Sequence, residues 1–502
     1  MRSTESIFLR LERSGYPMDV AGIYVLDAAP EGPLPFDDIR AVFGQRLSGS
    51  PIANRVIAHA PLRIGEDRWA QVDSVDLDAH MHHRVVPSPG DLPALMETVL
   101  EVSAEPLDRT QPLWEAWYLT GLADGRAALV LRLHHAVIDG MGMVALQQLL
   151  FDLEPTPVSR ERDPAPMSGR AHPSLARRAL VEIPSRVVAN TVATKRLVVS
   201  ATDLVGAMVR TAVPGPIRWG ERPGFMPSRS DAPPVTLFNR HVSDPRKSMA
   251  LVSLPFGQVQ AARALFPGVT INDVLLALVT GTMRDYLAAN GDLPDRPIRT
   301  SCPVNVRAAG DDGKTGNHLT TMWVDLPVHL TDPVERLAAV HASSTAAKAA
   351  LPQSKSDWDS LADVGDLLMP GVVSAAMALA GTKAFGFLPL AQNLTVSTLA
   401  GPRQPLYLAT RQIVNVFLRG IVCPPLHLFF AAITYDQHVD VSVTTVRQLC
   451  PDPQALVDGL QTELDRLSAA VKPKRRSQGR RSPSGQGPRR PASAKNRQGG
   501  GE

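Results

Sequence analysis

The stretch LRLHHAVIDGMGMVALQQLL (residues 131–150) decides the fold of this chain, because the periodicity of its apolar residues changes within it. The residues up to His135 form a short run rich in Leu and Val, which predicts a buried strand ending at the histidine pair. After Gly140 the apolar residues recur at helical spacing, and this set comprises Met143, Leu146, Leu150 and Leu153. The stretch therefore predicts a strand, a tight turn that contains Asp139, and a helix.

The two histidines are expected on opposite faces of the predicted strand, because side chains alternate along a strand. One face is expected to hold Leu129, Leu131, Leu133 and His135. The other is expected to hold Val130, Arg132 and His134. Two packed histidines and an Asp-Gly turn would explain the pattern without chemistry. However, HHxxxDG arises by chance in about one such sequence in a thousand, which favours a functional interpretation.

Length and composition predict a globular protein of two domains. At 502 residues the chain is too long for one ordinary core, and it is 44% hydrophobic and 20% charged. The net charge of +3 conceals a basic tail, since residues 472–502 carry +9 and the remaining 471 residues carry −6. The tail lacks aliphatic core residues and is expected to be disordered, either without a dedicated partner or bound to anionic lipid or nucleic acid. The body shows no basic surface interleaved with aromatic residues, so nucleic acid is not expected as the main partner.

Cysteine and histidine usage gives no sign of a metal site. The three cysteines, Cys302, Cys423 and Cys450, are widely spaced and fit reduced thiols in a cytosolic protein. The histidines of HMHHR, which are His80, His82 and His83, lack partner carboxylates or cysteines at ligand spacing. We therefore expect no metal and no cofactor.

No targeting or membrane-spanning segment is expected. The opening residues MRSTESIFLRLERSG are charged throughout, unlike a signal peptide. The longest uncharged apolar stretch, residues 367–382, is sixteen residues long and contains Pro and Gly. A spanning helix needs about 20 apolar residues, so this stretch is expected to be a core or interfacial segment.

The pattern along the chain predicts four parts: an N-terminal domain (1–153), a helical crossover linker (154–234), a C-terminal domain (235–470) and the tail (471–502). The crossover is apolar with interspersed basic residues, which permits contact with a membrane surface or packing against the protein's own body. Within the C-terminal domain we expect a helix over 272–291, a late strand pair that turns at Asp436, and a final helix over 452–471.

HHAVIDG, with PLDRTQPLWEAWYL upstream, resembles the bacterial wax ester synthase/diacylglycerol acyltransferase family. This family is one of the CoA-dependent acyltransferases, alongside chloramphenicol acetyltransferase and peptide-synthetase condensation domains. The resemblance covers nearly all of residues 1–470 through ESIFLRLERSGYPMDVAGIYVLD, WAQVDSVDLDAHMHHRVVPSPG, TINDVLLALVTG, CPVNVR and TGNHLT. The chain departs from the family at STLAGP (397–402), where the family has Ser-Asn-Val-Pro-Gly-Pro, and in its long basic tail.

The resemblance implies an α/β fold with two chloramphenicol-acetyltransferase-like domains and an active-site tunnel between them. Acyl-CoA would enter from one side and the hydroxyl acceptor from the other. The second histidine, His135, would be the general base, while Asp139 would hold the geometry of the site. Imidazole suits this task near neutral pH, no acyl-enzyme is required, and the sequence has no GxSxG elbow.

The remaining candidate residues have both structural and functional interpretations. A structural role is expected for His134, and Asp139 is expected to pair with backbone or an arginine, of which Arg307 is one candidate. Asn272 and Asp273 open a helix, where they would serve as an N-cap and first-turn acid or, by resemblance, line the site. Trp114 is expected to pack the core near the tunnel, and Ser397 is a candidate oxyanion donor. The candidate substrate-binding set is Gly140, Trp114, Asn272, Asp273 and Ser397.

The leading functional interpretation is an acyl-CoA-dependent diacylglycerol O-acyltransferase, with long-chain alcohols as a second acceptor. Such a protein is expected in the cytoplasm, associated peripherally with membrane or lipid droplets. One alternative is a related transferase that uses a carrier-protein-bound acyl donor to make a lipid diester. The other is a catalytically silent lipid-binding homologue. The Pro-Leu-Trp motif (PLW, residues 112–114) and the Asn-Asp motif (ND, residues 272–273) favour the leading interpretation over the first alternative. The intact HHxxxDG motif weighs against the second alternative. Acyl chain length, native acceptor and oligomeric state are left open.

Overall fold

The computed structural model describes most of the chain up to Val471. The described residues are 15–47, 52–59, 67–138, 140–156, 232–305, 319–351 and 391–471, with Glu5, Phe8, Leu9, Leu11, Glu12 and Ser50. Contacts group the chain into Met1–Val471, which holds all of these, and Lys472–Glu502. The predictions for the crossover linker, for residues 367–382 and for the basic tail lie outside the described residues.

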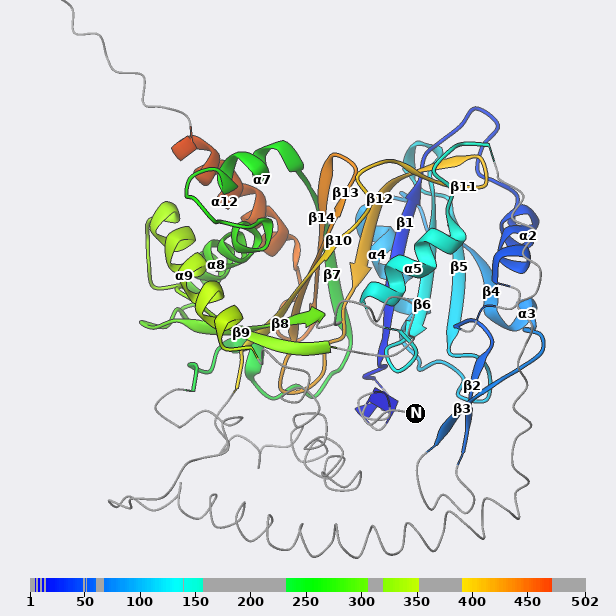
Figure 1. Ribbon diagram of the computed structural model, residues 1–502, viewed down its shortest axis with the longest axis horizontal. Coiled ribbons are helices and arrows are strands. Elements are labelled where there is room, and N and C mark those ends of the chain that lie inside the picture. The colour runs from blue at the N-terminus through cyan, green and yellow to red at the C-terminus, as the bar shows by residue number, and fades with distance from the viewer. Residues whose placement is uncertain are drawn as a thin grey trace, which may run out of the picture. The chain divides into compact units, whose positions relative to one another are not determined.

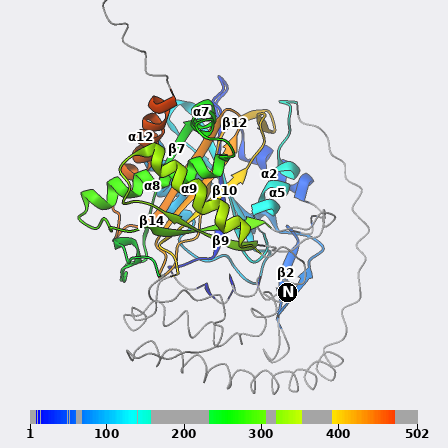
Figure 2. The ribbon, with the colours of Figure 1, turned by 60° about the vertical axis from the view of Figure 1, so that its left-hand side comes forward.

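Two six-stranded sheets form the architecture (Figures 1 and 2). The first has the order β11-β12-β1-β6-β5-β4, and the second the order β7-β14-β13-β10-β8-β9. Helices pack against both sheets, which confirms the predicted α/β class with two sheet-rich halves.

In chain order, the elements up to residue 150 are β1 (Asp19–Leu26), α2 (Phe36–Leu47), β2 (Arg55–Ala58), β3 (Arg68–Gln71), α3 (Leu77–His80), β4 (Met81–Val85), α4 (Leu92–Val102), β5 (Trp114–Thr120), β6 (Ala127–His134) and α5 (Gly140–Leu150). The elements from residue 247 onward are β7 (Lys247–Pro255), α7 (Phe256–Arg263), α8 (Ile271–Ala289), β8 (Ile298–Asn305), β9 (Leu319–Leu326), α9 (Pro333–Ala349), β10 (Leu394–Ala400), β11 (Leu406–Leu408), β12 (Arg411–Arg419), β13 (Leu428–Tyr435), β14 (His438–Val446) and α12 (Gln454–Val471).

The deciding stretch folds as predicted, into strand β6 followed by helix α5. The leucine face of β6 packs in a core with α2 and α5, while Val130 on the opposite face packs with α4 and with β7 of the second sheet. Two details of the prediction were wrong. The strand ends at His134, so His135 is the first residue of the turn, and α5 ends at Leu150, which leaves Leu153 57% exposed.

Strands β11 and β12 belong to the first sheet although they come from the later half of the chain. β12 pairs antiparallel with β1, placing Arg419 opposite Ala21. The connection continues into β13 of the second sheet, so one stretch of chain runs from one sheet to the other. The predicted domain boundaries stay a prediction, but the structure adds this exchange, which the order of elements along the chain does not reveal.

Helices α8, α9 and α12 cover one face of the second sheet (Figure 1). The predicted helices over 272–291 and 452–471 are confirmed as α8 and α12, and the predicted turn at Asp436 is confirmed between β13 and β14. Arg336 of α9 forms a buried ion pair with Glu463 of α12. Glu463 also lies against Gly281 of α8, where a Cβ would meet its carboxylate at 2.3 Å. The glycine lets α12 approach α8 closely enough for this pair to form. No helix within the described residues is long and apolar enough to cross a membrane.

A polar contact joins the two sheets at β12. The carboxylate of Asp440, on β14, accepts hydrogen bonds from the Val416 N–H at 2.7 Å and the Asn415 side chain at 3.1 Å. Ser253 of β7 also donates to this carboxylate at 2.5 Å. Burial raises the pKa of Asp440, even though these donors oppose the shift.

The first sheet is held at one end by a buried ion network around Asp19, the first residue of β1. Arg132 of β6 donates from Nε to the Asp19 carboxylate at 3.1 Å, and Arg419 of β12 forms an ion pair with the same carboxylate. Arg419 also donates to the backbone oxygen of Asp19 at 3.0 Å. All three side chains are buried, so three strands share one charge-paired contact.

The Arg419→Met variant tests this network. Methionine keeps the length of the side chain but removes its charge, so Asp19 loses one of its two cationic partners. We expect the free energy of unfolding to fall by about 3 kcal/mol, the usual result of breaking a buried pair. Urea unfolding would measure this. Arg84→Met, which removes an exposed ion pair with Glu101, is the control, with an expected loss of under about 1 kcal/mol. Equal losses in the two variants would contradict the role of the network.

Candidate active site

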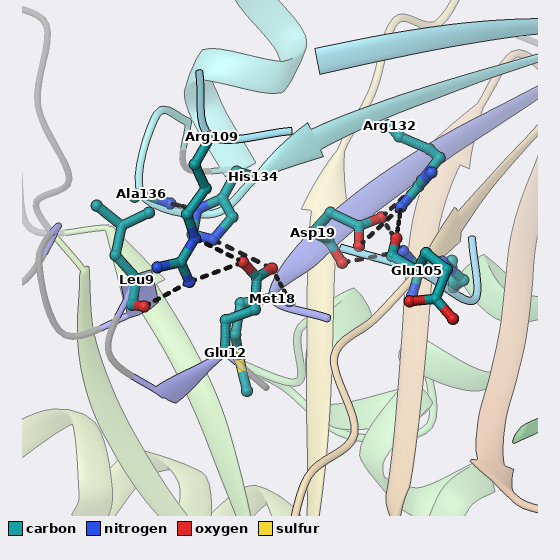
Figure 3. Close-up of polar contacts among 10 residues, drawn as sticks. Leu9, Glu12, Met18, Asp19, Glu105, Arg109, Arg132, His134 and Ala136 are labelled. Carbon is teal, nitrogen blue, oxygen red and sulfur yellow. Dashed lines mark hydrogen bonds and ion pairs between the residues drawn. The ribbon is translucent and has the colours of Figure 1, made fainter. Parts of the chain in front are cut away.

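His134 is the last residue of β6 and is fully buried. Its Nδ1 accepts a hydrogen bond from the Ala136 N–H at 3.0 Å, within the turn that follows the strand. Its Nε2 faces the carboxylate of Glu12, with 3.4 Å between Nε2 and Oε1 (Figure 3). That distance is within ion-pair range but long for a hydrogen bond.

The contacts of His134 define its tautomer. Because Nδ1 accepts a backbone N–H, the ring proton must lie on Nε2, where it points to the Glu12 carboxylate. The ring can take a second proton only at Nδ1, which would break the bond from Ala136. The structural role predicted for His134 stays a prediction.

The Glu12 carboxylate contacts three groups near the histidine turn. Besides facing His134, its carboxylate accepts from the Met18 N–H at 3.0 Å and from Arg109 Nη2 at 2.8 Å (Figure 3). Burial opposes ionisation of this side chain, but His134, Met18 and Arg109 together outweigh it and hold the pKa of Glu12 below its usual range. The carboxylate is thus a charged acceptor in a nearly closed site.

His135 has different surroundings from its neighbour. It is half-buried, and its backbone N–H donates to the Met18 carbonyl at 2.9 Å. Its imidazole lies parallel to the ring of Phe8, with 4.3 Å between centroids and 12° between planes. Stacking covers a face of the imidazole, whereas both ring nitrogens lie on its edge. His135 is thus the less buried of the two histidines, and its role as a base stays a prediction.

The segment before β1 also contacts the second half of the protein. Lys247, at the start of β7, donates from Nζ to the Gly15 carbonyl at 3.3 Å. Gly15 has φ +78°, and a Cβ there would meet Pro245 at 2.6 Å. Only glycine allows this approach without strain. Because Gly15 lies against Pro245 and Lys247, the chain entering β1 lies where the two halves of the protein meet, which we call the seam.

The structure separates several of the predicted site residues. Asp139 and Arg307 lie outside the described residues, so their expected roles stay predictions. Gly140 is the first residue of α5, directly after the histidine turn. Trp114 is buried in the core of the first half, and its Nε1 donates to the Ala53 carbonyl at 3.0 Å, which fits its expected packing role. Ser397 lies half-buried on β10 of the second sheet, opposite Ala431 of β13.

Asp273 is a buried residue in the first turn of helix α8, whose N-cap is Thr270, so the predicted N-cap at Asn272 was wrong. It forms a capping box with Thr270, whose N–H it accepts at 2.9 Å. The same carboxylate accepts from Ser344 of α9 and contacts His341 Nδ1 at 2.9 Å. Burial opposes its ionisation, but these donors lower the pKa of Asp273. Its described contacts run to the start of α8 and to α9, which confirms Asp273 as an acid in the first turn. Asn272, beside it, is half-buried, and a site-lining role for either residue stays a prediction.

The histidines of the HMHHR segment have partners of other kinds. His80 contacts the backbone oxygens of Asp76 and Pro112 at 2.9 and 3.1 Å. His82 packs against Trp117, and His83 lies 2.9 Å from the Thr120 hydroxyl. Among the described residues, no group of three or more potential ligands is placed to hold a metal ion.

Sequence reasoning missed Phe8, Glu12, Arg109 and Asp19 as neighbours of the histidines. A signal was present, because Phe8 and Glu12 are spaced for one face of a helical turn. Nothing in that spacing indicates what the face contacts, which depends on how residues almost a hundred positions apart meet.

The fold is that of acyltransferases and condensation domains. The structure resembles a wax ester synthase/diacylglycerol acyltransferase from Marinobacter aquaeolei VT8, with a TM-score of 0.64 at 20% identity, covering 93% of this chain and 98% of that one. It also resembles the first condensation domain of the calcium-dependent antibiotic synthetase, with a TM-score of 0.52 at 16% identity, covering 93% and 95% of the two chains. At these identities the likeness shows the fold alone, and it confirms the predicted class with two chloramphenicol-acetyltransferase-like halves.

The sequence matches the wax ester synthase/diacylglycerol acyltransferase catalytic domain over residues 1–275 and the C-terminal domain of the same family over residues 315–468. The chain belongs to this family and is an acyltransferase of its type. A Mycobacterium tuberculosis protein named "Putative diacyglycerol O-acyltransferase" is 29% identical over 484 residues, covering 94% of this chain and 97% of that protein. A second one, named "Probable diacyglycerol O-acyltransferase", is 27% identical over 479 residues, covering 94% and 99%.

The pH dependence of stability tests the surroundings of Lys247. Burial, with repulsion from Arg419, lowers the pKa of Lys247 from 10.5 to about 8 in the folded protein. Between these values the unfolded chain binds more protons than the folded one, so this lysine makes the protein more stable as the pH rises. We expect the free energy of unfolding of the wild type, minus that of Lys247→Met, to increase from pH 7.5 to pH 10. Urea unfolding at several pH values would measure it, and a constant difference would contradict the shift.

The Asp273→Asn variant tests the cap of α8. An amide nitrogen would face donors that the carboxylate now accepts, so we expect a loss of about 1–3 kcal/mol in the free energy of unfolding. The control is Asp332→Asn at the exposed N-cap of α9, where asparagine caps as well as aspartate and the change should be under about 0.5 kcal/mol. A changed KM in Asp273→Asn at unchanged stability would instead favour the site-lining interpretation.

Proposed function

We propose that this protein transfers a long-chain acyl group from acyl-CoA to the free hydroxyl of diacylglycerol, forming triacylglycerol, and that long-chain alcohols are a second acceptor. Family membership and the curated relatives support acyl transfer to diacylglycerol. The observation that carries the proposal is the unlike placement of the two histidines: the His134 ring is fully buried between the Ala136 N–H and the Glu12 carboxylate, whereas His135 is half-buried in the turn after β6.

In the proposed mechanism His135 is the general base. It takes the proton of the acceptor hydroxyl as the hydroxyl oxygen attacks the thioester carbonyl carbon. The carbon–sulfur bond then breaks, and the imidazolium returns the proton to the CoA sulfur. The ester forms in one transfer without an acyl-enzyme, so no nucleophilic side chain is required.

Other residues have supporting roles in this proposal. Asp139 holds the turn, with Arg307 as a candidate partner, and Ser397 donates a hydrogen bond to the developing oxyanion. Gly140, Trp114, Asn272 and Asp273 complete the proposed substrate-binding set. The substrates meet in a tunnel between the two halves, and no metal or cofactor takes part. Because the acceptors are insoluble in water, we propose a cytoplasmic protein that associates peripherally with membrane or lipid droplets.

The test offers the purified protein labelled palmitoyl-CoA with either dioleoylglycerol or hexadecanol, and measures labelled ester and free CoA. His135→Ala should lower kcat by about 10²–10⁴-fold, as for loss of a general base, with little change in melting temperature. His134→Ala should retain more activity but lose more stability, because its ring fills a fully buried site. His83→Ala, on the exposed face of edge strand β4, is the control and should keep wild-type activity.

Each contrary result points to a different conclusion. A His135 variant as active as the wild type would refute the proposed base. Ester formation only from a carrier-protein-bound acyl donor would establish the related transferase. Lipid binding without transfer from any donor would establish the silent homologue.

A further inference from the structure

One turn of chain near the N-terminus contacts both histidines of the motif. Phe8 and Glu12 lie four residues apart, and the Glu12 N–H donates to the Phe8 carbonyl at 3.1 Å, as in a helix. From this turn Phe8 stacks on His135, and Glu12 faces Nε2 of His134. The two imidazoles, which belong to β6 and the turn after it, therefore share a single short element as their neighbour.

We propose that the turn from Phe8 to Glu12 is a positioning element for acyl transfer. The inference rests on the proposed function, because it takes His135 as the base. Phe8 sets the plane of the His135 imidazole. Glu12 faces the Nε2 proton of His134, holds the ring in one orientation and thereby fixes the backbone from which His135 projects. Neither residue reacts; both act through the histidines.

The case for Glu12 comes from its buried contacts. Its side chain is 2% exposed and binds Met18 N–H and Arg109 in addition to facing His134. Met18 in turn accepts the backbone N–H of His135. The carboxylate thus joins the segment before β1, the loop before β5 and the histidine turn (Figure 3). Without this carboxylate, Arg109 and His134 would lose the negatively charged group that both of them contact. The histidine turn would then lose its fixed position.

The case for Phe8 comes from ring geometry. A general base must aim one nitrogen at the substrate hydroxyl, and that nitrogen lies in the plane of the imidazole. The near-parallel stack restricts rotation of this plane. A branched aliphatic side chain could fill the same volume beside Leu9, Leu113 and Ala136, but it offers no flat surface to define the plane. An error of about 1 Å in such placement can cost on the order of 100-fold in rate.

The position of the turn relative to the second half supports the same conclusion. Three residues after Glu12, Gly15 contacts Pro245 and Lys247 at the start of β7. Glu12 therefore contacts the first half of the protein and Gly15 the second. This places the histidine pair at a fixed position relative to the seam, where the two substrates are proposed to meet.

Phe8 is tested by comparing Phe8→Leu with Phe8→Tyr, using palmitoyl-CoA and dioleoylglycerol. Leucine keeps the apolar packing but not the flat ring, so kcat per folded protein should fall about tenfold or more, with KM and melting temperature little changed. Tyrosine keeps the stack and should restore kcat. Equal kcat values for the two variants would overturn the role of Phe8.

Glu12 is tested with Glu12→Gln and Glu12→Ala against Glu463→Gln. The glutamine variant keeps acceptors for Met18 and His134 and should lose less kcat than the alanine variant. Glu463 forms a buried ion pair with Arg336 between α12 and α9, so its variant matches the loss of a buried charge. It should lower the melting temperature without lowering kcat per folded protein. Glu12 variants that behave like this control would show a structural role only.

A spectroscopic signature reports on His134 directly. In protein labelled with ¹⁵N-histidine, long-range ¹H–¹⁵N spectra should show the His134 proton on Nε2 alone, with the signals assigned by their loss in His134→Asn. Glu12→Ala should change the chemical shift of this Nε2–H and speed its exchange with water, which Glu463→Gln should not. An unchanged Nε2–H signal in Glu12→Ala would overturn the role of Glu12.

The outcomes separate this inference from the function on which it rests. A fully active His135→Ala overturns the proposed function and the inference with it. An inactive His135→Ala together with a fully active Phe8→Leu overturns the role of Phe8 alone and leaves the proposed function in place.

Discussion

The buried carboxylate of Asp19 is the contact on which the first sheet depends. It is paired with Arg132 from β6 and Arg419 from β12, so it joins three strands, one of which enters the sheet from the far end of the sequence. Charges removed from water are costly unless they are paired, which penalises any other register of these strands. Asp19 lies opposite His134 in the β1–β6 pairing. The network that fixes the sheet therefore also fixes where the histidine turn begins.

Two adjacent histidines have unlike surroundings because β6 ends between them. His134 still belongs to the strand and is enclosed by Glu12 and the Ala136 N–H. His135 belongs to the turn, is half-buried and stacks on Phe8. Strand alternation predicts that the two side chains diverge, but the divergence comes from the end of the strand. One histidine is fully buried and the other half-buried, and this difference comes from the position at which the strand ends.

The motifs of the family do not all contribute in the same way. Asp273 of the ND motif completes the capping box of α8 with Thr270 and joins that helix to α9 through Ser344 and His341. Gly401 of STLAGP lies so close to β13 that a Cβ would meet the Thr434 carbonyl at 2.4 Å. In this chain the Gly of the STLAGP motif is thus explained by packing between β10 and β13. Resemblance alone does not separate residues that maintain the fold from residues that face a substrate.

The sequence by itself determined the local elements and the motif. Periodicity was sufficient to predict β6, α5, α8 and α12, because the residues of the apolar face of a strand or helix lie two to four positions apart in the sequence. It also determined the family, through HHAVIDG and the segments around it. Only the tertiary structure decided which residues surround the histidines. Glu12 meets Arg109 and His134 across about a hundred residues or more, and Arg419 meets Asp19 across 400. Such contacts are set by strand pairing and by the burial of charge, and no local pattern in the sequence encodes either of them.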